Sequence, residues 1–204
     1  MSVSGVILAA GASSRLGRPK QLLELDGEPI LRIVVRSALA SRLEEVILVL
    51  GAHAEEIAGA MGDLGQRVVE NPDFREGQST SLRIGLSAVA SRADAVLFLL
   101  GDQPEVDPAV IDRVIEAFER TSRPIVQPVY GTTPGNPVLF ARAVFPELLC
   151  VAGDQGARSL IRGRLEGVER VTVSDGRPPS DVDTDEDYQA LLQRWKRRIQ
   201  RTSE

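Results

Sequence analysis

The sequence predicts an α/β fold with a mostly parallel central sheet, and two patterns carry that prediction. Short apolar runs alternate with segments of helical periodicity along most of the chain, as expected of repeated strand–helix units. The most apolar run, Ala95–Leu100 (AVLFLL), is typical of a strand buried on both faces of a parallel sheet. No internal repeat and no long linker interrupts the alternation, so residues 1–204 are expected to form one domain.

The predicted strands are apolar runs that stop at glycine, proline or polar residues. Asn71-Pro72 ends one run, and the loop GTTPGNP separates two others. In chain order, the predicted strands are residues 6–10, 46–50, 67–70 and 95–100, two short strands within 125–140, and 168–173.

The predicted helices place apolar residues three or four positions apart, as an amphipathic helix requires. Leu82, Leu86 and Val89 share a face of one such segment, and Pro108 suits the first turn of another. In chain order, the predicted helices are residues 29–39, 54–61, 79–90, 108–120, 141–149, 157–165 and about 186–199.

The composition is that of an ordinary globular protein, with 43% hydrophobic and 26% charged residues and a net charge of −5. No apolar run approaches the roughly 20 residues that span a bilayer. The N-terminus lacks the basic start of a signal peptide. Cys150 is the single cysteine, which excludes an internal disulfide and a multi-cysteine zinc site. A cytoplasmic protein without a membrane partner is therefore expected.

Two further features narrow the function class. His53 is the only histidine, and no serine-nucleophile motif accompanies it, so a loop or helix-cap role is expected for it. The C-terminal sequence RWKRRIQRTSE is basic, but cations are also favourable at a helix C-terminus. With a negative net charge and 4% aromatic residues, the chain predicts no nucleic-acid partner, and Trp195 is expected to pack against the body.

The first loop, LAAGASSRLGRPK (residues 8–20), has the chemistry of a phosphate site. A turn at Gly11 exposes backbone N–H groups, two serines add hydroxyls, and Arg15, Arg18 and Lys20 add three cations before the first acidic residue, Glu24. Such a loop at the carboxyl end of a first strand is where an open α/β sheet holds phosphates. Neither the P-loop pattern nor the G-x-G-x-x-G fingerprint fits it.

Carboxylates follow later in the chain. Asp102 comes directly after the strand at 95–100, where a side chain can reach the crevice above the sheet. In DVDTDEDY (residues 181–188), Asp181 and Asp183 fall on one side of an extended segment, while the later acidic residues favour the start of the last helix. Carboxylate oxygens suit Mg²⁺, which binds one or two carboxylates together with substrate phosphates. A helix-capping role is the alternative for Asp102.

Five segments together resemble the molybdenum cofactor cytidylyltransferases, with the guanylyltransferases of the same cofactor as close relatives. They are LAAGASSRLGRPK, ENPDFREGQSTSLRIGL, LLGDQP, PGNPVLF and DVDTDEDY, in that order across nearly the whole chain. The resemblance implies a single Rossmann-like domain with three layers, of the nucleotide-diphospho-sugar transferase type. It also implies a Mg²⁺-dependent reaction in which the molybdenum cofactor (molybdopterin) attacks the α-phosphorus of CTP and releases pyrophosphate.

The same resemblance implies roles for individual residues. Arg15, Lys20 and Asp102 would be catalytic, and Asp102 and Asp183 would bind the metal, with Asp181 the weaker candidate. The implied nucleotide contacts are Leu8, Ala9, Ala10, Gly11, Ser13, Ser14, Arg15, Lys20, Asn71, Ser79, Ser81, Gly101 and Asp102. The implied acceptor contacts are Gln103, Pro104, Asn136, Asp154 and Arg158.

Several alternatives stay open on the sequence alone. Asn136 stands where relatives more often have histidine, and an amide carries no proton at neutral pH, so the acceptor is less determined than the reaction. Ser79 and Asp154 also suit helix caps. A GTP-dependent guanylyltransferase, a sugar-phosphate nucleotidyltransferase, and a silent carrier that delivers cofactor to a molybdenum hydroxylase are the other functions considered. A carrier has no need of two metal carboxylates, and the missing fingerprint disfavours an NAD-dependent dehydrogenase.

Overall fold

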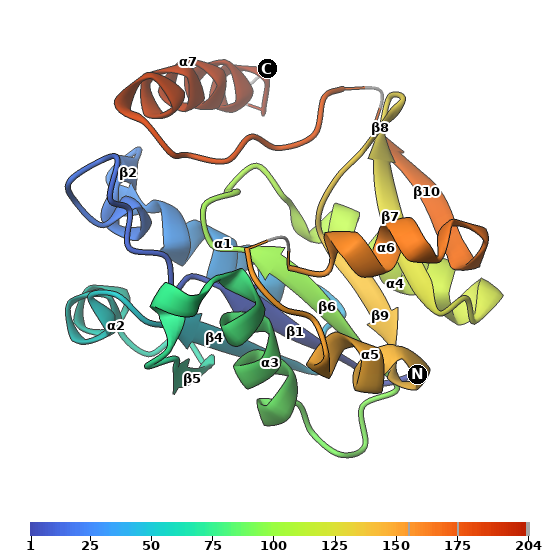
Figure 1. Cartoon of the computed structure of the whole chain (residues 1–204). Helices are drawn as coiled ribbons and strands as arrows, with labels where there is room; N and C mark the ends of the chain where they lie inside the picture. Colours follow the sequence, from blue (N-terminus) through green and yellow to red (C-terminus); the bar gives the residue numbers. More distant parts are fainter. Residues whose placement is uncertain (155, 175, 203–204) are drawn as a thin grey trace.

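A central sheet of eight strands organises the computed structural model, which describes residues 1–154, 156–174 and 176–202. The strand order is β10-β7-β9-β6-β1-β4-β5, with β8 paired to β7 (Figure 1). The strands are β1 (Val3–Leu8), β4 (Glu45–Leu50), β5 (Arg67–Glu70), β6 (Ala95–Leu100), β7 (Ile125–Tyr130), β8 (Thr133–Pro134), β9 (Val138–Ala141) and β10 (Val168–Ser174). Four of the pairings are parallel, and those of β9 with β6 and β7 and of β8 with β7 are antiparallel. The predicted mostly parallel sheet is confirmed.

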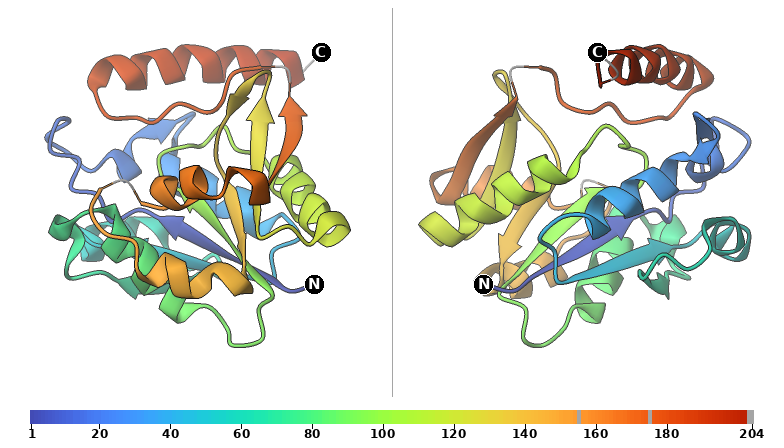
Figure 2. Two further views of the ribbon diagram at one scale, coloured as in Figure 1. Left: turned by 45° about the vertical axis from the view of Figure 1, so that its right-hand side comes forward. Right: turned by 180° about the vertical axis from the view of Figure 1, so that it is seen from behind.

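Helices cover both faces of this sheet and give the fold three layers (Figures 1 and 2). One apolar cluster joins the sheet to α1 (Ile30–Leu39), α2 (Ala54–Met61) and α4 (Pro108–Thr121). The other joins the sheet to α3 (Gln78–Ala88), α5 (Phe145–Leu149) and α6 (Arg158–Gly163). Successive side chains of a strand therefore enter opposite clusters, as Val6 and Ile7 of β1 do, and both are fully buried.

β1 occupies the position that matters for the site. It lies between β4 and β6, parallel to both, so the chain leaves its carboxyl end where connections diverge to the two sides of the sheet. Gly101, directly after β6, brings the two strand ends close, because a Cβ there would lie 2.8 Å from the Cβ of Ala9. The crevice outside the carboxyl ends of β1 and β6 is the ligand position that this topology favours.

The C-terminal part of the chain crosses the top of the sheet. Residues 176–184 run from β10 to α7 (Asp185–Thr202), which lies over the hairpin of β2 (Glu24–Leu25) and β3 (Glu28–Pro29) (Figure 2). A third apolar cluster holds α7 there; its members are Leu23, Leu25, Ile30, Val182 and Leu191, with Tyr188 and Trp195 packed against it. The predicted packing of Trp195 against the body is confirmed.

Thr184 and Asp187 form a reciprocal cap at the start of α7. The Asp187 carboxylate accepts from the backbone N–H of Thr184 at 2.9 Å, and the Thr184 hydroxyl accepts from the backbone N–H of Asp187 at 3.2 Å. The stabilising role predicted for the acidic residues at this helix start is therefore confirmed for Asp187. This cap also anchors Asp183, whose backbone N–H donates to Asp187 at 3.2 Å.

The boundaries of the predicted elements agree with the structure to within a few residues, and those of α2, β5 and β6 agree in full; the short strands β2, β3 and β8 were not predicted. The start of α3 lies one residue earlier than predicted, and this changes which residue caps the helix. Gly77 is its N-cap, with a φ of 109° that favours glycine, so the alternative of Ser79 as cap is wrong. No described helix is both long and apolar enough to cross a bilayer.

Candidate functional site

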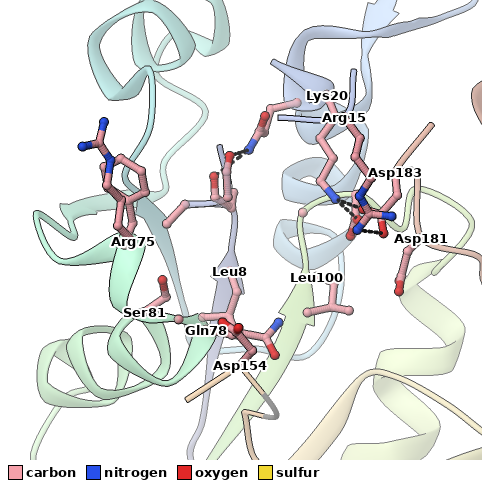
Figure 3. A pocket seen from close by; sticks show the side chains of 18 of the residues that line it. Leu8, Arg15, Lys20, Arg75, Gln78, Ser81, Leu100, Asp154, Asp181 and Asp183 are labelled. Carbon is pink, nitrogen blue, oxygen red and sulfur yellow. Dashed lines mark hydrogen bonds and ion pairs between the residues drawn. The ribbon is translucent and has the colours of Figure 1, made fainter. Parts of the chain in front are cut away.

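A cleft of about 520 Å³ opens at the carboxyl ends of β1 and β6 (Figure 3). Its walls come from the loop after β1, the start of the loop after β6, the 3₁₀ turn η2 (Phe74–Glu76) with the start of α3, the loop before α6, and the segment before α7. The lining residues are Leu8, Ala9, Ala10, Gly11, Arg15, Lys20, Gln21, Phe74, Arg75, Gly77, Gln78, Ser81, Leu100, Gly101, Asp102, Asp154, Arg158, Asp181 and Asp183.

Lys20 joins two carboxylates at one end of the cleft. Its Nζ donates to Oδ2 of Asp102 at 2.6 Å and to Oδ1 of Asp183 at 3.0 Å. The Arg15 guanidinium lies 3.2 Å from the other oxygen of Asp183 (Figure 3). Four residues from three distant parts of the chain are thereby brought to one point, although nothing in their sequence separation requires it.

Burial and charge shift the pKa values of Lys20, Asp102 and Asp183. Burial by itself would lower the pKa of Lys20, but the charges and hydrogen bonds of its two carboxylate partners outweigh burial and raise that pKa above 10.5. Burial raises the pKa of Asp102, against the opposing charge of Lys20. The hydrogen bond from Lys20 holds the pKa of Asp183 below its ordinary value, because Asp183 is the more exposed carboxylate.

The first loop forms the floor of the cleft. Gly11 is exposed to it, and a Cβ at Gly11 would meet no protein atom within 4 Å, so the backbone there is open to a ligand. Ser13 does not line the cleft; its hydroxyl accepts from the backbone N–H of Lys20 at 3.1 Å. Ser14 is exposed outside the cleft. Gln21, which no pattern in the sequence marked as functional, is buried beneath the loop.

The opposite end of the cleft is built by η2 and α3. Ser81, Gln78 and Arg75 line it, and Figure 3 places them across from Lys20. Asn71 and Ser79 are buried and do not line the cleft. The Asn71 amide instead donates to the Ser81 hydroxyl at 2.8 Å, so Asn71 fixes a lining residue from behind. Phe74 and Arg75 carried no signal in the sequence, because only the turn that ends at Gly77 brings them to the cleft.

The predicted acceptor residues fall into three groups. Asp154 and Arg158 line the cleft. Asn136 lies in a small adjoining cavity of about 60 Å³, which shares Leu8, Gln78, Leu100 and Arg158 with the cleft.

Gln103 and Pro104 form the third group, since both are buried and line neither cavity. The Gln103 amide donates to Asp181 at 2.7 Å, so it holds the segment that carries Asp183.

The structure also tests three helix-capping roles that the sequence suggested, those of Asp102, Asp154 and His53. Asp102 is not a helix cap, because Asp107 is the N-cap of α4 and its side chain accepts from the N–H of Val110. Asp154 is not one either, since α6 begins after Ala157. His53 does precede α2 as its N-cap residue, but its side chain makes no capping hydrogen bond.

A divalent cation fits the donor set at the Lys20 end. Asp102 and Asp183 present oxygens to the same ammonium group, and hard oxygen ligands of this kind suit Mg²⁺ or Mn²⁺. Among the residues that the structure describes, no group of three or more His, Cys, Asp or Glu side chains forms a complete metal site. The arrangement therefore matches a cation that is shared between two protein carboxylates and the phosphates of a substrate.

Comparisons with known proteins show the family of this chain. Residues 5–171 match the model of the MobA-like NTP transferase domain. The chain is 32% identical over 199 residues to the nicotine blue oxidoreductase of Paenarthrobacter nicotinovorans, which covers 93% of this chain and 96% of that protein. It is 24% identical over 196 residues to the molybdenum cofactor cytidylyltransferase of Escherichia coli K12, with 95% and 97% covered.

A solved structure extends the similarity to the fold. The crystal structure of the Rv0371C complex with manganese, from Mycobacterium tuberculosis H37Rv, superposes with a TM-score of 0.82 at 35% identity. The superposition covers 95% of this chain and 99% of that one. A divalent cation is thus present in a close structural relative.

Proposed function

This chain belongs to the family of the MobA-like NTP transferase domain and is a nucleotidyltransferase; from that premise we propose that it transfers the nucleotidyl group of CTP to the molybdenum cofactor in a Mg²⁺-dependent reaction. The observation that carries the proposal is the meeting of Lys20, Asp102 and Asp183 beside the open backbone at Gly11. A cationic floor and two convergent carboxylates are what a metal-bound triphosphate requires.

In the proposed complex, the triphosphate lies along the first loop. Exposed N–H groups around Gly11 receive its oxygens, and Arg15 and Lys20 supply positive charge from the same side. Lys20 neutralises Asp102 and Asp183 when no other cation does so, and it lies within reach of a phosphate in the cleft. A divalent cation held by these two carboxylates would neutralise charge on the phosphates during transfer.

The acceptor needs no general base. A phosphate monoester has a second pKa of about 6, so it is largely ionised at neutral pH and is itself the nucleophile. Its oxygen forms a bond to the α-phosphorus, and the bond from that phosphorus to pyrophosphate breaks. Catalysis then consists of positioning and charge stabilisation, which explains why His53 lies outside the cleft.

The acceptor is proposed to enter from the side of Arg158 and Asn136. Arg158 lines both cavities and offers a cation to an anionic acceptor. Asn136 offers amide donors and acceptors at the end of the smaller cavity. The molybdenum cofactor is proposed here from the name of the Escherichia coli relative, and the product would be delivered to a molybdenum hydroxylase.

The test is pyrophosphate release with molybdenum cofactor and Mg²⁺, run separately with CTP, GTP, ATP and UTP. Release with CTP alone is expected. Release with GTP alone would indicate a guanylyltransferase. Release only with sugar phosphates as acceptors would show that a sugar phosphate, and not the molybdenum cofactor, is the acceptor. Arg18→Met is the control for variants of the charged residues in the cleft. Arg18 is a cation of the first loop, but it pairs with Asp185 outside the cleft, so this variant should keep its activity.

A second candidate function follows from the name of the Paenarthrobacter relative, which is an oxidoreductase of nicotine blue. The sequence identity to this relative, 32%, is higher than the 24% identity to the cytidylyltransferase, and both alignments cover more than 90% of this chain. The test is loss of the blue colour in the presence of NADH or NADPH and purified protein. Reduction that survives Asp102→Asn, without any pyrophosphate release by the wild type, would favour this second function.

A further inference from the structure

Gln21 is buried beneath the first loop with all of its polar groups engaged. Its side-chain amide donates to the backbone carbonyl of Ala9 at 2.8 Å and to that of Gly11 at 3.2 Å. Its side chain is among the few buried polar ones, at 2% exposure. A buried amide that donates both protons to one loop is a structural tie, because it has no proton left for a ligand.

Ser13 extends this tie to the end of the loop. The Ser13 hydroxyl donates to Oε1 of Gln21 at 3.4 Å and accepts from the backbone N–H of Lys20 at 3.1 Å. Ser13 itself has a positive φ of 52°, an unfavourable backbone conformation that the surrounding bonds hold in place. One network therefore fixes the start, the middle and the last residue of the segment from Ala9 to Lys20.

The orientation of two peptide planes follows from these bonds. In a trans peptide the C=O and the following N–H point in opposite directions. Because Gln21 holds the carbonyls of Ala9 and Gly11 on the buried side, the N–H groups of Ala10 and Ala12 are turned away from Gln21. Within the described part of the chain, these two N–H groups donate to no protein acceptor.

The consequence for a bound anion is electrostatic. Carbonyl oxygens facing the cleft would repel phosphate oxygens, whereas free N–H groups attract them. Ala10 lines the cleft and Ala12 does not, so it is the bond from Gln21 to the Ala9 carbonyl that determines whether this peptide presents a donor or an acceptor to the cleft. This effect depends on the phosphates and not on the base.

We infer that Gln21 is a positioning residue for the phosphate tail: by holding the Ala9 and Gly11 carbonyls it keeps the first loop in the conformation that binds a triphosphate. The inference rests on the proposed function, since it concerns the same cleft. It assigns to Gln21 a role through the backbone, without contact to the reacting atoms.

The experiment compares binding of inorganic tripolyphosphate, CTP and cytidine by calorimetry, with Mg²⁺ present. Gln21→Met keeps the volume of the side chain and removes both donors. It is expected to weaken binding of tripolyphosphate and of CTP about tenfold while leaving the affinity for cytidine unchanged. A change confined to the phosphate-bearing probes is the signature that a general loss of structure would not produce.

The matched control is Ser4→Ala, which removes the hydrogen bond of 2.6 Å from the buried Ser4 to the partly exposed Glu45, near the opposite end of β1. It is expected to bind all three probes as the wild type does. If Gln21→Met fails to fold, Ser13→Gly replaces it, because glycine accepts the positive φ; a loss of about threefold for tripolyphosphate is then expected.

Two different results would overturn the inference, and only the second would also overturn the proposed function. Wild-type affinity for tripolyphosphate in Gln21→Met or Ser13→Gly would remove the role of the network while leaving the proposed function intact. Absence of binding of both CTP and tripolyphosphate by the wild type would overturn the proposed function itself and the inference with it.

Discussion

The Lys20 end of the cleft (the charged end) and the small adjoining cavity that Asn136 lines (the apolar end) are built by different means. At the Lys20 end, charged side chains from distant segments contact one another at 2.6 to 3.2 Å, and each has a named partner. At the Asn136 end, a small cavity is walled mainly by apolar side chains of β6, β9, α3 and α6, and Asn136 and Arg158 are among its few polar residues. Under the proposed function, the charged end would perform the nucleotidyl transfer, whereas the apolar end would distinguish one acceptor from another.

The largest effect is expected from Asp102→Asn, which acts at the charged end. The variant keeps the shape of the side chain but removes a buried negative charge that faces Lys20. Because charge stabilisation is the main catalytic contribution proposed, turnover should fall by about 100- to 1000-fold. Pyrophosphate release measures it, and a circular dichroism spectrum identical to that of the wild type shows that the fold is kept.

Arg18→Met is the control for this prediction. Arg18 pairs with the exposed Asp185 at 2.8 Å, so its loss removes a cation from the loop without touching the cleft. Turnover within about twofold of wild type is expected, since exposed ion pairs contribute little. Equal losses in both variants would mean that the net charge of the loop, and not the geometry around Lys20, sets the rate.

The next effect concerns stability and its pH dependence, through Lys20→Met. Lys20 has a raised pKa in the folded protein, so its contribution to stability is full below pH 10.5 and is lost as the pH rises through the folded pKa. At pH 7 the variant should lose about 1–3 kcal/mol, because Asp102 is left buried without its cation. Thermal unfolding from pH 8 to 11.5 in a metal-free buffer should show the wild type converging on the variant.

A constant difference between the two proteins across that pH range would contradict the ion pairing of Lys20. Arg113→Met offers a comparison, since Arg113 donates to the backbone carbonyl of Val173 and forms no ion pair with a carboxylate of the described residues. Its stability difference should not fade between pH 8 and 11.5, because the backbone partner does not titrate.

A smaller and more specific effect is expected at the apolar end, from Asn136→Ala. Loss of one amide should raise the KM for the acceptor by about three- to tenfold and leave the KM for the nucleoside triphosphate unchanged. Steady-state kinetics with each substrate varied in turn provides the measurement. An equal rise in both KM values would show that the two cavities are not separate subsites.

The sequence predicted the charged end better than the apolar end, and the reason is physical. The loop that carries Lys20 and the residue Asp102 follow buried strands whose parallel pairing brings their carboxyl ends together, and the cationic motif of the first loop then pointed to Lys20 itself. Gln21 and Arg75 escaped prediction because their roles depend on hydrogen bonds and turns that no local pattern encodes. The strand β9 was predicted as one of the two short strands within 125–140, but its antiparallel direction was not, since a short apolar run does not record the direction of its neighbours.

The smallest effect should come from Thr184→Ala, which tests whether the cap of α7 serves the charged end. The hydrogen bond from Thr184 is the main reason that the pKa of Asp187 lies below its ordinary value of 3.8. A carboxylate with a lowered pKa contributes stability above its unfolded pKa, and that contribution is lost as the pH falls through the folded pKa. The variant should therefore lose about 0.5–1 kcal/mol at pH 7, as expected for an exposed cap, and less at pH 3. Because Asp183 also donates to Asp187, the same variant should lower turnover about twofold; unchanged turnover would show that Lys20 and Arg15 hold Asp183 without help from the cap.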